Sequence, residues 1–129
     1  MDYNQKVVKD QSKNLGVDFD GVIHNDNLGF HDGTIYGKPI EGSLESIKLL
    51  SKFFNIIIFT AKAKKDRPLI NGKTGAELVE EWLLKHDLLK YVSHITAEKP
   101  RALLYVDDKG YRFENWKDTI KFIKSISEI

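Results

Sequence analysis

The chain has no cysteine, and no apolar run in it is long enough to cross a bilayer. Without cysteine there are no disulfide bonds, no thiolate metal ligands and no thiol nucleophile. The longest apolar run, Ile56–Phe59, is far shorter than the roughly 20 residues of a membrane-spanning helix. Residues 1–14 are polar and lack the apolar stretch of a signal peptide. We therefore expect a soluble cytoplasmic protein with no membrane partner.

An excess of one charge is also lacking, because 20 Lys and Arg residues stand against 19 Asp and Glu residues. The net charge of +1 gives no global reason to expect binding to nucleic acid. The 129 residues, 41% of them hydrophobic, suffice for one domain with a buried core. No repeat or linker divides the chain, so we interpret residues 1–13 as a lead-in and 14–129 as a single domain.

Strand and helix patterns alternate along the chain from residue 15 onward. This alternation predicts a parallel sheet with right-handed crossovers and helices on both faces, which is a three-layer, Rossmann-like α/β domain. An Asp-Gly turn at Asp32 predicts a hairpin over Leu28–Tyr36. Strands are expected at 15–19, 55–59, 93–96 and 102–106, a short edge strand at 111–113, and helices at about 43–53, 74–86 and 115–126.

The first strand ends in two carboxylates, Asp18 and Asp20, and Gly21 follows at once. In an extended strand residues i and i+2 point to the same side, so we expect both acids to project from the strand's carboxyl end. Anions this close repel each other unless a cation or a shared proton lies between them. Taken alone, the pattern fits turn-forming aspartates at a strand end equally well.

Other polar residues fall at the same edge of the predicted sheet. Thr60 follows the second strand, and Asp107 and Asp108 follow the fourth. Lys99 lies in the loop just before the fourth strand. Because open α/β sheets bind ligands beyond the carboxyl ends of their strands, these residues form a more specific set than any single motif.

This set suits phosphoryl transfer, which depends on positioning and on stabilising the charge of the phosphoryl oxygens. Asp18 is the candidate nucleophile for phosphorus. Asp20 is placed to protonate the leaving oxygen and later to deprotonate water. Thr60 can donate a hydrogen bond to a phosphoryl oxygen. Mg²⁺ held by hard oxygen ligands, together with Lys99, would offset the repulsion between the two reacting anions.

The segments Asp18–Val22, Ile58–Thr60, Lys99 and Tyr105–Asp108 resemble the four ordered motifs of the haloacid dehalogenase (HAD) superfamily. The resemblance runs from Leu15 to Ile126 and implies a HAD core of the phosphatase type. The implied catalytic residues are Asp18, Asp20, Thr60 and Lys99, and the implied Mg²⁺ ligands are Asp18, Asp20 (also through its backbone carbonyl), Asp107 and Asp108, with Asp107 favoured over Asp108 as the direct ligand.

Members of this family usually carry a cap domain after the first or second motif. Here about 40 residues separate Asp20 from Thr60, and about as many separate Thr60 from Lys99, which leaves no room for a cap. The chain therefore resembles capless members, with the hairpin as the only flap over an open site. Such a site accepts a large substrate or is covered by a second subunit. The candidate substrates are nucleotides, sugar phosphates, nucleic-acid ends and phosphoproteins.

Two other classes of function are considered as alternatives. A metal-dependent nuclease would use the carboxylates for two metal ions, but it gives no clear task to Thr60 and Lys99. A receiver-like or non-catalytic phosphate-binding module also uses aspartates, Thr and Lys with Mg²⁺. Its acidic pair comes at the first strand and its Lys at the last, so the order of residues here argues against it.

Several further residues are interpreted as structural. We interpret the basic loop 61–73 as a solvated charged loop. The alternative is that its positive charges guide a polyanionic substrate to the site. His24 and His31 are expected to be surface residues rather than contacts to substrate. Trp82 and Trp116 lie on apolar helix faces and are predicted to belong to the core.

Overall fold

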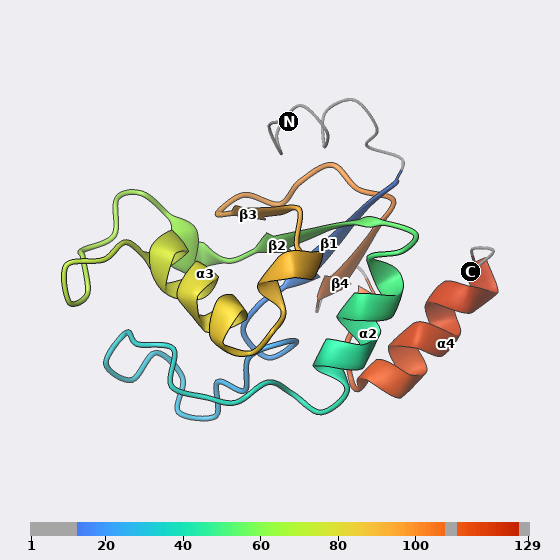
Figure 1. Ribbon diagram of the computed structural model, residues 1–129, viewed down its shortest axis with the longest axis horizontal. Coiled ribbons are helices and arrows are strands. Elements are labelled where there is room, and N and C mark those ends of the chain that lie inside the picture. The colour runs from blue at the N-terminus through green and yellow to red at the C-terminus, as the bar shows by residue number, and fades with distance from the viewer. Residues whose placement is uncertain (1–12, 108–110, 127–129) are drawn as a thin grey trace.

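The computed structural model of the chain describes residues 13–107 and 111–126 (Figure 1). The lead-in predicted for residues 1–13 therefore lies almost wholly outside the described residues. Asp108, one of the expected metal ligands, also lies outside them.

The described strands form one parallel sheet of five strands, in the order β3-β2-β1-β4-β5. This confirms the parallel α/β class. The order runs one way from β1 through β3 and the other way from β4 to β5, so the direction reverses between β1 and β4, where such sheets bind ligands. The strands are β1 (Asn14–Asp18), β2 (Asn55–Phe59), β3 (His94–Thr96), β4 (Leu104–Asp107) and β5 (Tyr111–Arg112).

The helices begin where their sequence signals place them. A capping box opens the second α-helix, because Thr74 Oγ1 accepts from the Glu77 N–H at 3.1 Å and Glu77 Oε1 accepts from the Thr74 N–H at 3.0 Å. Asn115 Oδ1 accepts from the Asp118 N–H at 2.8 Å and caps the last one. No helix in the described ranges has the length and apolarity to cross a membrane. The helices are α2 (Ser43–Leu50), α3 (Gly75–Lys85), α4 (Trp116–Ile126) and the short 3₁₀ helices η2 (Ala61–Ala63) and η3 (Leu89–Tyr91).

Among the described residues, the three α-helices pack on one face of the sheet (Figure 1), and the helices expected on the other face are not found in those residues. Strand side chains alternate between the faces, and only one set packs with the helices. That set is Leu15 and Val17 of β1, Ile56 and Ile58 of β2, and Val106 of β4, and it meets Ile47 and Leu50 of α2, Val79 and Leu83 of α3, and Trp116 and Ile123 of α4.

The handedness of the crossovers explains this arrangement. The connections from β1 to β2 and from β2 to β3 run in the same direction, so right-handed crossovers place α2 and α3 on the same face. The described connection from β3 to β4 contains no helix to cover the other face. There, Phe59 and Tyr105 pack edge to face over Gly16, where a Cβ would lie 2.7 Å from the Tyr105 ring.

The segment 28–36 does not form the predicted hairpin. It consists of turns, and no strand pairing is present within it. The Tyr36 hydroxyl takes the place of the cross-strand bonds, because it accepts from the Leu28 N–H at 2.9 Å and donates to the Gly29 carbonyl at 2.7 Å. An ordered loop, rather than a β-hairpin, therefore lies beyond the end of β1.

The inner face of α4 offers a test of this packing. Ile123 is 1% exposed whereas Ile126 is 53% exposed, although helical spacing alone places both on the inner face. We expect Ile123→Ala to lower the free energy of unfolding by about 2–5 kcal/mol, because it leaves a cavity in the core. The matched change Ile126→Ala should lower it by no more than about 0.5 kcal/mol. Chemical denaturation measures both, and equal losses would contradict the packing.

Candidate active site

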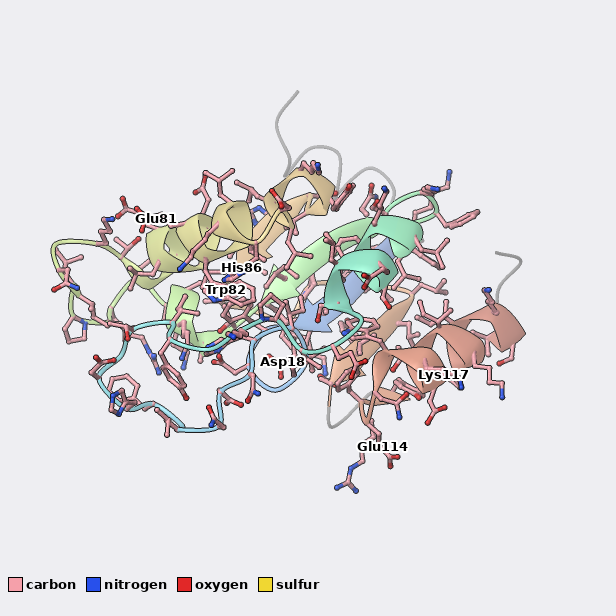
Figure 2. The ribbon with its side chains drawn as sticks, turned by 60° about the horizontal axis from the view of Figure 1, so that its bottom comes forward. Asp18, Glu81, Trp82, His86, Glu114 and Lys117 are labelled. Atoms are coloured by element: carbon pink, nitrogen blue, oxygen red, sulfur yellow. The ribbon has the colours of Figure 1, made fainter. Side chains whose placement is uncertain are left out.

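The carboxylate of Asp18 lies at the carboxyl end of β1, at the centre of the sheet (Figure 2). Val17 pairs with Val106 of β4, so the next residues, Asp18 and Asp107, end neighbouring strands in register. Asp18 Oδ1 accepts a hydrogen bond from the Phe19 N–H at 2.8 Å, which fixes the orientation of the side chain. The sheet thus brings two of the expected acids to one place.

Lys99 provides a cation to the buried carboxylate of Asp107. Its Nζ lies 2.8 Å from Asp107 Oδ2, and the Asp107 side chain is only 5% exposed. The ammonium also lies 4.4 Å from the centre of the Tyr105 ring and 5.7 Å from that of Phe59. The Tyr105 hydroxyl donates to the carbonyl of Pro100, which ties down the loop that carries Lys99. A lysine from the β3–β4 loop is therefore held at the carboxyl edge, as the sequence predicts.

The carboxylate of Asp20 has two other partners, His24 and Lys62. Its Oδ1 lies 2.8 Å from His24 Nδ1, and its Oδ2 lies 3.1 Å from Lys62 Nζ. Lys62 comes from η2, which directly follows β2. The mutual repulsion of the acids at this edge is thus offset by one lysine at Asp107 and a second at Asp20.

His24 is fully buried, which contradicts its interpretation as a surface residue, whereas His31 is exposed as expected. The His24 ring packs against Phe19, Tyr36 and Trp82. Figure 2 shows Trp82 on the side of α3 that faces the loop between β1 and α2, which carries His24.

The hydrogen bonds of His24 also set the position of its proton. Gly37 N–H donates to Nε2 at 2.9 Å, so Nε2 carries no proton and the Nδ1–H points at Asp20. Gly37 is needed there, because a Cβ would collide with the Asn25 carbonyl and the His24 ring. The neutral imidazole is therefore a fixed hydrogen-bond donor to Asp20.

These contacts determine the charge of Asp20. Burial raises the pKa of its carboxyl group, but the hydrogen bond from His24 and the positive charge of Lys62 outweigh burial and hold the pKa below the ordinary value of 3.8. Asp20 is therefore ionised at neutral pH in this state of the protein. It is ready to accept a proton, and it can donate one only after its surroundings change.

Thr60 is buried at the end of β2, as the sequence predicts. Its Oγ1 accepts from the Lys62 N–H at 3.2 Å and caps η2. This role uses a lone pair of the hydroxyl, so the O–H proton can still be donated to a ligand.

The donor atoms at this edge fit a hard cation such as Mg²⁺. Asp18 and Asp107 bring carboxylate oxygens to neighbouring strand ends, and no described backbone N–H donates to the carbonyl oxygen of Asp20. Asp20 would contribute that carbonyl rather than its carboxylate, which is held by His24 and Lys62. Within the described ranges, no three acidic or histidine side chains gather closely enough to form a metal site by themselves, and Asp108 lies outside those ranges.

Two residues of the site were not assigned a role from the sequence. His24 lies four residues after Asp20 in an apolar stretch, and this spacing across a turn is its only local signal. Lys62 lies two residues after Thr60 and was grouped with the rest of the basic loop. Comparison of the chain with protein-family models, with curated proteins and with solved structures finds no match.

The hydrogen bond from His24 can be tested through the pKa of Asp20. His24→Phe keeps a ring of similar size but removes both polar contacts. We expect the pKa of Asp20 to rise, because its carboxylate loses a donor. We also expect a loss of about 1–3 kcal/mol in stability, because the Gly37 N–H loses its acceptor. Carbon-detected NMR titration of the carboxyl groups measures the pKa, with His31→Phe as the control. An unchanged pKa of Asp20 would show that His24 is not its donor.

Proposed function

We propose that the chain is a Mg²⁺-dependent phosphomonoester hydrolase of the HAD type that acts through an aspartyl-phosphate intermediate. The observation that carries the proposal is the meeting of Asp18, Thr60 and Asp107 at one edge of the sheet, with Lys99 bound to Asp107. This edge combines a carboxylate nucleophile, a hydroxyl donor and a cation, which are the groups that phosphoryl transfer requires.

In the first step, an Asp18 carboxylate oxygen forms a bond to phosphorus while the bond from phosphorus to the leaving oxygen breaks. Lys99 and the Thr60 hydroxyl stabilise the charge on the phosphoryl oxygens. Bound Mg²⁺, held by Asp18, Asp107 and the Asp20 carbonyl, would add positive charge beside those oxygens. The fully buried strand residues beneath this edge keep the groups at fixed positions.

Asp20 transfers the protons in both steps. For the first, it must be protonated and give its proton to the leaving oxygen. An arriving phosphate dianion raises the pKa of Asp20 by repulsion and attracts the ammonium of Lys62 away from it, so the substrate itself favours protonation. In the second step, ionised Asp20 takes a proton from water, whose oxygen attacks phosphorus. Inorganic phosphate leaves, and the Asp18 carboxylate is regenerated.

The nucleophile and the metal are tested together by phosphate release. We expect Asp18→Asn to lower the rate by on the order of 10³-fold or more, because an amide cannot form the acyl-phosphate. A chelator should abolish wild-type release, and added Mg²⁺ should restore it. Asp87→Asn, an exposed change after α3, is the control and should keep the wild-type rate. Full activity of Asp18→Asn would rule out the assigned nucleophile.

The role of Asp20 is tested by the dependence on the leaving group. We expect Asp20→Asn to slow the hydrolysis of alkyl phosphates by about 10²–10⁴-fold, because a poor leaving group needs a proton in the transition state. Release of p-nitrophenol, a much better leaving group, should slow far less in single-turnover measurements of the first step. The same loss for both leaving groups would contradict a general-acid role.

A further inference from the structure

An open cavity of about 200 Å³ adjoins Asp20. It is lined by residues that follow β1 and β2, whereas Asp107 ends β4, on the other side of β1. Asp20 and Lys62 are among the residues that line it. Phe30 and Asp26, from the loop after β1, and Arg67, from the basic loop, line its walls. Because the general acid must contact the leaving oxygen, a cavity beside Asp20 is where the rest of the leaving group would lie.

The two loops also approach each other closely, because a Cβ at Gly33 would collide with the Ile70 side chain. A second, smaller cavity is lined by Phe30 and Ile35 from one loop and by Arg67 and Ile70 from the other. The walls therefore belong to one assembled structure at the mouth of the site. The leaving-group cavity is a feature of the fold and not a gap between separate loops.

The walls combine groups that recognise a flat, aromatic and anionic molecule. Phe30 is 62% exposed and lines this cavity, so its ring is open to contact with a ligand. Arg67 offers a planar guanidinium that stacks on rings and binds phosphate. Asp26 is the one acidic wall residue besides Asp20 among the described lining groups, and its carboxylate can accept from a sugar hydroxyl or an exocyclic amine.

We propose that this cavity takes the nucleoside part of a nucleotide substrate, with the base against Phe30 and Arg67. The proposal rests on the proposed phosphatase function and names its substrate class. A sugar alone, or a phosphorylated serine or threonine side chain, would leave the Phe30 ring without an aromatic partner. Stacking on an aromatic side chain is tolerant of the identity of the base, so all nucleobases are expected to be accepted.

The contribution of the base is measured by comparing two substrates that differ only in it, adenosine 5′-phosphate and ribose 5-phosphate. We expect the wild-type protein to prefer the nucleotide in kcat/KM. Phe30→Ala should reduce that preference about tenfold, the usual effect of removing one stacked ring. Phe30→Tyr, which keeps an aromatic ring, should show the wild-type preference for the nucleotide. Leu28→Ala, an equally exposed change in the same loop, should keep the wild-type preference. Equal kcat/KM for the two substrates, or no effect of Phe30→Ala on their ratio, would overturn the proposal.

A binding measurement separates this proposal from the proposed function. Titration calorimetry of Asp18→Asn with adenosine 5′-phosphate and ribose 5-phosphate needs no turnover. If the wild-type protein released phosphate from no ester, the phosphatase proposal would fail, while about tenfold weaker nucleotide binding by Asp18→Asn/Phe30→Ala would still support the cavity. Failure of the nucleotide to bind more tightly than the sugar phosphate would reject the cavity, whatever the activity.

The source of the nucleotide is resolved by a third substrate, a short single-stranded oligonucleotide with a terminal phosphate. Lys64 and Lys65 are exposed on the same basic loop, just before Arg67 in the sequence. For a nucleic-acid end, we expect kcat/KM above that of the mononucleotide, a fall with added salt, and a further loss in Lys65→Gln. For a free mononucleotide, we expect the oligonucleotide to be the poorer substrate. Either result supports nucleotide recognition and assigns its source.

Discussion

Parallel strands bring their carboxyl ends to one edge of a sheet, and in this chain that edge gathers the like charges of Asp18, Asp20 and Asp107. Repulsion among them would destabilise the fold if they had no cations nearby. Lys62 and Lys99 supply these cations, and both come from connecting segments rather than from strands. The connections after β2 and β3 are therefore tied to the edge by charge, and the same lysines are the cations that a phosphate ester would meet.

The core holds the loops of the site through two tryptophans. Trp116 of α4 donates its indole N–H toward the Val22 carbonyl and the Ser43 hydroxyl, both at 3.2 Å. Trp82 of α3 donates to the Gly37 carbonyl at 3.0 Å. Residues 22 and 37 lie on either side of the loop that packs around His24. Burial of the two tryptophans therefore also fixes the position of His24, which donates to Asp20. Core packing and the orientation of the Asp20 carboxylate are thus coupled.

Much of the framework could be predicted from the sequence, because local signals specify it. The run Asn55–Phe59 is a strand with the predicted bounds, and the capping box at Thr74 opens α3 as its pattern indicates. The burial of His24 could not be predicted, because it depends on Trp82 and Tyr36, which are distant in sequence and meet it only in the fold. The lack of a helix in the β3–β4 connection was also missed, because alternation of elements does not reveal it.

Among the described residues, the fold separates positions that the core fixes from positions that can vary. Asp18, Thr60 and Asp107 follow buried strands, so changing their positions would disturb the core. Phe30 and Arg67 lie on exposed loops that line one cavity together with Gly75 and Leu78 of α3. Substitutions in these loops can therefore change the lining of the cavity without moving the carboxylates at the strand ends. Under the proposed function, this division would place the reacting groups at the edge of the sheet and the selection of the leaving group in the loops.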